Sequence, residues 1–398
     1  MKNVAFTTVA LFGFFALVIV AVIDVFAPAV GRTEVGAATR TSVPQGPLEK
    51  ELEMSSGEIL EVNLRPGGSI HIRGWDEERA LVRISLREDN ADAFRFEIER
   101  TRSGVEITSE RLRRLNNVNV RVDVQVPRRS DLRLRTAGGG ISIRNIEGSI
   151  SGRTAGGELT LENLKGSIEL STGGGEITLT DSQLDGTVST GGGKVLVENV
   201  EGDIAASSGG GEVVYRNVVT PDHTYPADAV YIRNAGGSIR VDDAPAGAHV
   251  TTGGGNIRIR SAAGYARAST GGGDIRIEAV DGWVEAGTGA GTIEVTMIGK
   301  PGDERRDVTL KSGLGNIYLT LPSDLSARFE VELAYTQNSS QRFQINSDFD
   351  LVEERTDTWD TTQGTPRKYI RATATVGGGE NLIKIRTTNG DVHLRKRD

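Results

Sequence analysis

Residues 136–145 read TAGGGISIRN, and a similar sequence pattern recurs about every 18 residues. The shared pattern is TxGG-x-[IVL]-x-[ILV]-x-N, with glycine pairs or triplets between alternating branched residues. A fixed short period predicts a solenoid, in which each repeat is one coil that cannot bury its apolar face alone. The repeats start at Thr136, Thr154, Thr172, Thr190, Ser208, Asn234, Thr252, Thr270, Thr288 and Ser312, with two longer steps, before Asn234 and before Ser312.

Alternation within each repeat predicts the core. The branched residues five and seven positions after each start fall on one face of a strand, and stacking at about 4.8 Å joins them into columns. A second strand after the next turn is expected to add more inward residues. The expected inward residues are Ile141, Leu159, Ile177, Val195, Val213, Ile239, Ile257, Ile275 and Ile293, then Ile143, Leu161, Leu179, Val197, Tyr215, Val241, Ile259, Ile277 and Val295, with Ile150, Ile168, Ile204, Ala266 and Val284 on the second strand.

These features predict an all-β fold, a parallel β-solenoid with coils of about 18 residues that follows an N-terminal transmembrane or signal helix. The expected segments are a signal peptide or membrane anchor at 1–30, a linker at 31–50, capping coils at 51–135, regular repeats at 136–321, and an irregular C-terminal segment with a closing coil at 322–398. The apolar run from Val4 to Ile23 is long enough to span a bilayer, which takes about 20 residues. Small-residue cleavage sites follow it, so a cleaved signal and a retained anchor both remain open. Either interpretation predicts export.

The turn residues have structural explanations. The polar residue nine positions after each start, such as Asn145 and Asn163, predicts an asparagine ladder that satisfies buried turn groups. A row of metal ligands is the alternative, but the nine-residue spacing of calcium-binding β-rolls is missing. The glycines are expected to permit positive φ and close approach of coils. A phosphate-binding loop would need a Walker or dinucleotide motif, and none follows these blocks.

Composition narrows the function classes. A net charge of −8 and a pI near 5.3 argue against a nucleic-acid partner, whose phosphates demand a basic face. The chain has no cysteine, so disulfides, thiol catalysis and cysteine-bound zinc are excluded. The four histidines are scattered, and no nucleophile is accompanied by a base. We therefore expect no enzyme activity, no catalytic residues, no metal and no cofactor.

One outer face offers a candidate ligand site. Arg240, Arg258 and Arg276 stand six positions after three consecutive starts, and Tyr265 and Trp283 stand thirteen positions after two adjacent starts. Arginines beside aromatic rings suit an anionic glycan, because guanidinium pairs bidentately with carboxylate or phosphate. The alternative is a solvated face, on which nearby acidic residues neutralise the arginines. The arginines and the two rings need not form one site.

Three longer stretches carry a family resemblance. They are GGSIHIRGWDEERALVRI, VRVDVQVPRRSDLRLRTAGGGISIRNIEG and GGGENLIKIRTTNGDVHLRKRD. Together they resemble the bacterial putative-adhesin family of exported β-strand-repeat proteins, over roughly residues 59–396. The resemblance implies a parallel β-helix-like fold and a location in the cell envelope. It carries over no catalytic residue.

The leading functional hypothesis is a non-enzymatic envelope or surface scaffold that displays loops for contact with a glycan or an envelope protein. Membrane contact would be made through the N-terminal helix if that helix is not cleaved. One alternative is a β-helix enzyme acting on polysaccharide, which rests on fold analogy alone. Another is a periplasmic regulatory or structural partner of membrane proteins.

Overall fold

The computed structural model describes residues 48–65, 67–86, 93–113, 120–219, 229–299, 305–339, 341–362 and 364–397 of the 398-residue chain. All of them belong to one compact unit, residues 40–398. The described residues form no α-helix, and their strands join into one large, mostly parallel sheet of 29 strands. The expected signal peptide or anchor at 1–30 lies outside the described residues. Within the described ranges, no helix is long and apolar enough to cross a membrane.

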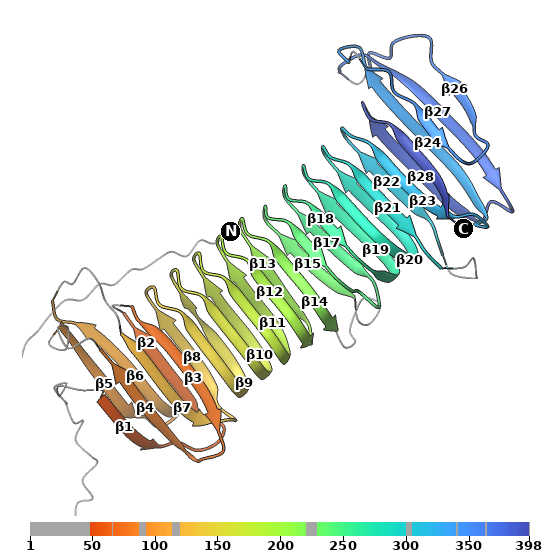
Figure 1. Cartoon of the computed structure of the whole chain (residues 1–398). Helices are drawn as coiled ribbons and strands as arrows, with labels where there is room; N and C mark the ends of the chain where they lie inside the picture. Colours follow the sequence, from red (N-terminus) through yellow and green to blue (C-terminus); the bar gives the residue numbers. More distant parts are fainter. Residues whose placement is uncertain are drawn as a thin grey trace, which may run out of the picture. The chain divides into compact units, whose positions relative to one another are not determined.

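Successive repeats pair side by side in parallel. The three longest central strands are β9 (Ile141–Thr154), β10 (Leu159–Thr172) and β11 (Ile177–Thr190). In their register Leu159 lies between Ile141 and Ile177, so each residue faces its equivalent one repeat away. The same offset continues through the green and cyan strands of Figure 1. The repeat period of the sequence is therefore the period of strand pairing.

Each repeat contributes to two rows of strands. The first row contains β12 (Val195–Glu201), β14 (Val213–Val219), β16 (Ile239–Val241), β18 (Ile257–Ile259), β21 (Ile293–Met297) and β23 (Ile317–Pro322). The second row contains β13 (Ile204–Ser208), β15 (Val230–Asn234), β17 (Ala248–Thr252), β19 (Ala262–Thr270) and β22 (Val308–Ser312). The strands β9, β10, β11 and β20 (Ile275–Thr288) run through both rows, because they continue around the corner between them.

The core lies between the two rows and follows the predicted columns. Every residue of the two predicted columns is at most 2% exposed, and the five predicted inward residues of the second strand are at most 4% exposed. The prediction of the core is therefore confirmed. A third inward position, ten residues after each start, was not predicted; it carries Ile146, Leu164, Val200, Val218 and Val280, all at most 2% exposed.

The hydroxyl residue that starts each repeat is buried and bonds to the preceding repeat. The Oγ1 of Thr172 donates to the carbonyl of Gly157 at 2.7 Å, and the Oγ1 of Thr190 donates to the carbonyl of Gly175 at 2.8 Å. A buried carbonyl without a partner costs about 1–3 kcal/mol. This bond explains why threonine or serine stands at the start of most repeats. The same bond is made by Thr136, Thr154, Ser208, Thr252, Thr270, Thr288, Ser312 and Thr387.

The glycine blocks allow neighbouring repeats to approach closely. A Cβ on Gly175 would lie 2.1 Å from the carbonyl oxygen of Gly157. The predicted close approach is confirmed. The predicted positive φ is wrong for the blocks of the repeats that start between Thr136 and Thr288, since positive φ occurs instead in the opposite turns, at glycines such as Gly148 and Gly166.

The predicted asparagine ladder is confirmed, but its environment was predicted wrongly. The Nδ2 of Asn163 donates to the Oδ1 of Asn145 at 2.7 Å, and Asn217 and Asn199 repeat this bond at 3.0 Å. These bonds lie at an exposed corner, not among buried turn groups. The residues of the ladder have φ between 49° and 59°, a left-handed conformation that asparagine tolerates better than most residues. The ladder therefore stabilises a corner that faces solvent.

The N-terminal part begins with β1 (Leu48–Glu53), which starts inside the predicted linker. Its parallel pairs join β2 (Ile59–Leu64) with β6 (Gly104–Arg111) and β8 (Asp131–Thr136), and β3 (Ser69–Trp75) with β7 (Arg121–Pro127). Its antiparallel pairs join β4 (Arg79–Ser85) with β7 and with β1, and β5 (Phe94–Arg100) with β6. The strand β3 pairs in register with β9, Ile70 opposite Ile141. The strand β8 also pairs in register with β9, Thr136 opposite Thr154, so both β3 and β8 extend the regular pairing into the predicted capping coils, and strands of opposite direction follow them.

The C-terminal part consists of further strands and ends in the regular register. The closing strands β28 (Asn381–Thr388) and β29 (Val392–Arg397) pair in parallel with β22 and β23, and Thr387 lies opposite Ser312. The residues between form β24 (Ala327–Thr336), β25 (Ile345–Ser347), β26 (Val352–Arg355) and β27 (Arg367–Val376). The strand β24 joins β28, and β27 and β26 follow it in antiparallel pairing. Antiparallel strands therefore cover the end of the second row, as they do at the N-terminal part.

Two alanine substitutions in one glycine block separate close packing from glycine content. Gly175→Ala should lower the free energy of unfolding by about 1–3 kcal/mol, because its Cβ would press against rigid backbone. Gly174→Ala is the matched control, since nothing lies within 4 Å of its Cβ position, and its effect should stay within about 0.5 kcal/mol. Urea unfolding followed by circular dichroism measures both. Equal effects of the two variants would contradict the stacking explanation.

Candidate functional site

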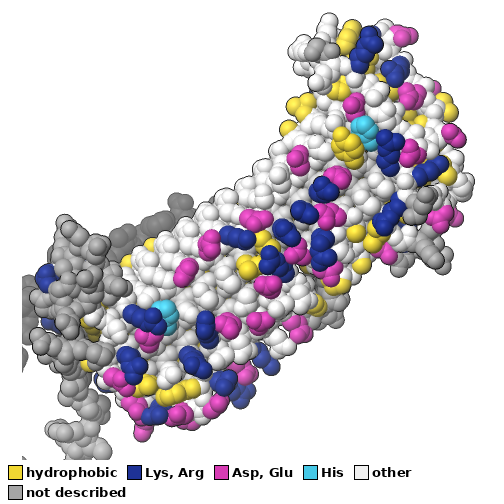
Figure 2. Space-filling model, viewed as in Figure 1, with side chains coloured by type: hydrophobic (Ala, Val, Ile, Leu, Met, Phe, Trp, Pro, Cys, Tyr) yellow, Lys and Arg dark blue, Asp and Glu magenta, His cyan; other side chains and the backbone are white. Residues whose placement is uncertain are grey.

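The predicted arginines form a row on the first row of strands. Arg240, Arg258 and Arg276 are register partners on β16, β18 and β20. Arg240 pairs with Asp242 at 2.9 Å, and Arg258 and Arg276 share Glu278 at 2.6 and 3.4 Å. Each arginine in this row therefore has an acidic partner on the protein itself. The face seen in Figure 2 likewise shows basic and acidic side chains interspersed.

The two predicted rings form a stack on the second row of strands. Tyr265 and Trp283 are register partners, with ring centroids 5.0 Å apart and planes 12° apart. A Cβ on Gly247 would lie 2.3 Å from the Tyr265 ring, so that residue covers the other ring face. The guanidinium of Arg305 lies 5.4 Å from the Trp283 ring centroid. Both rings are thus covered by protein groups, and they lie beyond the corner from the three arginines.

The interruptions of the repeat are only partly described. His223 and Tyr225 lie outside the described residues. In the second interruption Arg306 is buried, and its Nη2 lies 2.7 Å from the Oδ1 of Asp281 while its Nη1 donates to the carbonyl of Ile298. That arginine has a structural role, because it ties the returning chain to the preceding repeat.

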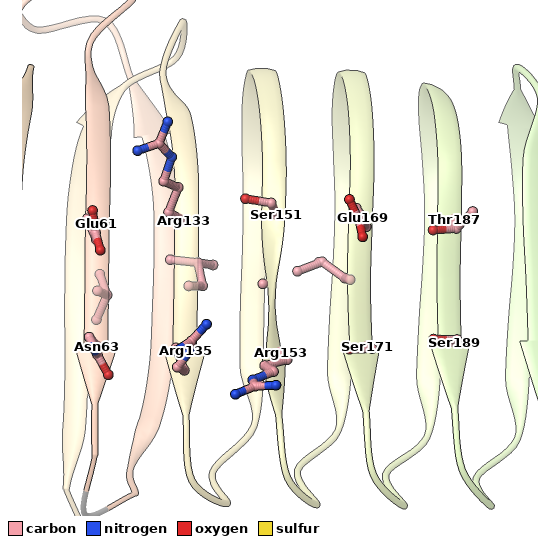
Figure 3. Close-up of a pocket in the computed structure, with 14 residues that line it drawn as sticks. Glu61, Asn63, Arg133, Arg135, Ser151, Arg153, Glu169, Ser171, Thr187 and Ser189 are labelled. Carbon is pink, nitrogen blue, oxygen red and sulfur yellow. The ribbon is translucent and has the colours of Figure 1, made fainter. Parts of the chain in front are cut away.

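A groove crosses the second row of strands, over β2, β8, β9, β10 and β11. Its volume is about 540 Å³. Two rows of side chains line it in Figure 3. The upper row is Glu61, Arg133, Ser151, Glu169 and Thr187, and the lower row is Asn63, Arg135, Arg153, Ser171 and Ser189. A neighbouring hollow of about 390 Å³ shares Asn63, Arg135 and Arg153 and adds Arg65.

The arginines of the groove lack acidic partners. Across the described residues, Arg65, Arg133, Arg135 and Arg153 make no ion pair and no hydrogen bond. All four are exposed. Arg135 and Arg153 face each other on adjacent parallel strands, where like charges destabilise the pair. This arrangement differs from the Arg240 row, in which every guanidinium is neutralised.

Several polar groups on either side of the arginines also lack a protein partner. The hydroxyls of Ser171, Thr187 and Ser189 make no side-chain hydrogen bond to any described residue. The Oδ1 of Asn63 is buried without a hydrogen-bond partner among the same residues. The groove therefore offers cationic donors and hydroxyl groups on a single open surface, with an unsatisfied amide oxygen buried beneath it.

A histidine lies in a second hollow, of about 700 Å³, on the first row of strands. Burial lowers the pKa of His71 below its ordinary value, and the positive charges of Arg121 and Arg144 lower it further. Asp123 and Glu158 act in the opposite direction and do not compensate. The folded environment of His71 therefore favours the neutral imidazole more than solvent does.

The groove is not visible in the sequence, because its residues belong to distant segments that do not share the repeat pattern. Glu61 and Asn63 lie far before Arg133 and Arg135 in the sequence, yet β2 and β8 are paired neighbours. The recurring hydroxyl residues shortly before the glycine blocks were the available signal. A second aromatic stack, Tyr318 on His393 with centroids 4.6 Å apart, was also missed.

The comparisons with known proteins leave function open. No protein-family model matches the chain, and no curated protein matches it. The resemblance to the putative-adhesin family therefore remains a resemblance.

Three solved structures are similar to the chain at low identity. A putative cell adhesion protein from Clostridium sporogenes is 10% identical, covers 88% of this chain and 100% of its own, and has a TM-score of 0.17. A putative lipid binding protein from Parabacteroides distasonis is 13% identical, with 69% and 96% covered and a TM-score of 0.28. A putative adhesin from Bacteroides fragilis is 12% identical, with 69% and 98% covered and a TM-score of 0.26. Similarity at this level assigns no ligand or activity.

Alanine substitutions distinguish the ring stack from the Arg240 row. Trp283→Ala should lower the free energy of unfolding by about 2–4 kcal/mol, because it removes the ring that covers Tyr265. Arg258→Ala should change it by less than about 1 kcal/mol, as expected for an exposed ion pair. Urea unfolding measures both. A Trp283→Ala protein as stable as the Arg258→Ala protein would show that the stack contributes little to folding.

The lowered pKa of His71 predicts a pH-dependent stability. Well above the ordinary histidine pKa of about 6.5 the imidazole is neutral in both states, and as pH falls the unfolded chain binds the proton first. The contribution of His71 to stability is therefore lost as pH falls through its folded pKa. The urea midpoint of the wild type should fall more between pH 7.5 and 5.5 than that of His71→Gln. Parallel pH profiles would contradict the prediction.

Proposed function

We propose that the chain is a parallel β-solenoid exported to the cell envelope, where it acts as an adhesin-like scaffold that binds a glycan or an envelope protein. The constant offset of one repeat in the strand register supports the solenoid, since it joins each repeat to the next in both rows of strands. The apolar run from Val4 to Ile23 supports export. Stacked repeats of this kind present broad outer surfaces that are suited to binding.

The groove is the observation that carries the binding function. It is open, lined by unpaired arginines and hydroxyl groups, and built on paired strands instead of loops. Side chains on regular strands are held at fixed spacing, which suits recognition of an extended ligand. The groove thus has the features of a binding surface for a polar polymer.

The carboxylates of the groove favour binding over hydrolysis. Two-carboxylate glycosidases hold their acidic groups about 5–9.5 Å apart. Glu61 and Glu169 stand three strands apart in the same row, a separation of about 14 Å at the usual strand spacing. We therefore propose a non-enzymatic role and retain polysaccharide hydrolysis as the competing hypothesis.

Surface location and ligand binding test this function separately. The full chain with a C-terminal tag should be removed from intact cells by an added protease, while a cytoplasmic marker remains protected. A chain protected in intact cells and cleaved only after lysis would contradict surface exposure.

A glycan array tests binding with the fragment 40–398, which contains every pairing partner of the described strands. Binding to a subset of glycans, with no release of new reducing ends, is the expected result. Release of reducing ends from a polysaccharide panel would support the enzyme hypothesis instead.

A further inference from the structure

The groove concentrates positive charge that the protein itself leaves unneutralised. Arg135 and Arg153 are register partners on neighbouring strands, whose backbones lie about 4.8 Å apart at the usual spacing. Arg65 lines the hollow beside them. No acidic residue stands in the lower row of the groove. Like charges at this spacing destabilise a sheet, and an anion placed between them relieves the repulsion.

We propose that the groove binds an acidic polysaccharide, whose carboxylate or sulfate groups pair with Arg135, Arg153 and Arg65. This inference rests on the proposed binding function and specifies its ligand. Arginine suits both anions, because its planar fork of donors forms two parallel hydrogen bonds to a carboxylate or a sulfate. The hydroxyls of Ser171 and Ser189 continue the lower row beyond the arginines. There they can donate hydrogen bonds to sugar hydroxyls and accept hydrogen bonds from them.

The upper row distinguishes a sugar polymer from a denser polyanion. Glu61 and Glu169 lie in it beside Arg133, Ser151 and Thr187. A carboxylate accepts hydrogen bonds from sugar hydroxyls, but it repels a chain that carries a charge on every unit. The lining residues, all of them described, also include no aromatic ring on which a nucleic-acid base could stack. A hydroxyl-rich polymer with spaced charges fits both rows.

The test compares four forms of the fragment 40–398. Arg135→Gln with Arg153→Gln removes two charges from the groove. Ser171→Glu keeps every arginine but places a carboxylate beside Arg153, its register partner. Arg258→Gln with Arg276→Gln is the matched control, because it removes two charges that Glu278 and Glu294 already neutralise.

Binding is measured by biolayer interferometry at low and physiological salt. The probes are hyaluronate, which carries one carboxylate per disaccharide, kappa-carrageenan, which carries one sulfate per disaccharide, uncharged dextran, and single-stranded DNA, which carries a phosphate on every nucleotide. Circular dichroism and urea unfolding confirm that every variant is folded.

The wild type should bind at least one acidic polysaccharide in a salt-sensitive manner, and its affinity for dextran and DNA should be lower. The Arg135/Arg153 double variant and Ser171→Glu should each weaken that binding at least tenfold, and the Arg258/Arg276 control should not. Which acidic polymer responds identifies carboxylate or sulfate as the recognised group. Equal binding by all four proteins, or DNA binding as tight as polysaccharide binding, would overturn the inference. If the groove variants bind the acidic polysaccharides as the wild type does, the inference about the groove fails. Surface exposure, which is tested separately on intact cells, is unaffected by that result.

Discussion

The structure depends on the contact between equivalent residues one repeat apart. At the glycine blocks this contact is so close that a Cβ on Gly175 would lie 2.1 Å from a carbonyl oxygen of the preceding repeat. At the same corner the hydroxyl of Thr172 satisfies a partly buried carbonyl of that repeat. The glycine allows the approach and the threonine removes its polar cost. Each repeat can therefore add to the last with a constant offset in register.

Because every repeat can pair with a further strand, the two ends of the sheet need to be covered. An uncovered parallel row would present unpaired backbone groups and would add further strands. At the N-terminal part β1 and β5 pair in antiparallel fashion, and at the C-terminal part β27 and β26 do the same. The chain returns to the regular register at β28 after its long excursion, so the last repeat stacks directly on the Ser312 repeat.

The same register governs the charge of the outer surface. Because equivalent positions become neighbours, a residue that recurs in the repeat forms a row of like side chains. The Arg240 row is balanced by carboxylates such as Glu278 on the same face. In the groove Arg135 faces Arg153 with no such partner in the described part of the chain. A neutralised row leaves no charge for an external ligand, whereas the unneutralised row is the one that we propose binds an anion.

Sequence alone was enough to place the inward columns, the repeat period, the close approach of the glycines and the asparagine ladder. Each of these depends on alternation and on neighbours one repeat apart, which a repeated sequence displays directly. The buried threonine bonds were visible as a pattern but had no assigned partner, because the carbonyl they reach lies on another repeat. The exposed corner of the ladder was also hidden, since burial depends on how the turn bends.

The groove and the ring stack were decided by tertiary structure. Asn63 and Arg135 come together only because β2 pairs with β8, across a stretch that does not follow the repeat. Tyr265 is covered because Gly247 lies against its ring, so the two rings form a stack in which Tyr265 is buried and Trp283 is half-buried. Periodicity thus determined which residues stack, through the local geometry of the strand. Which of these side chains stay exposed and unpaired was determined only by the tertiary structure, because it depends on which distant strands become neighbours.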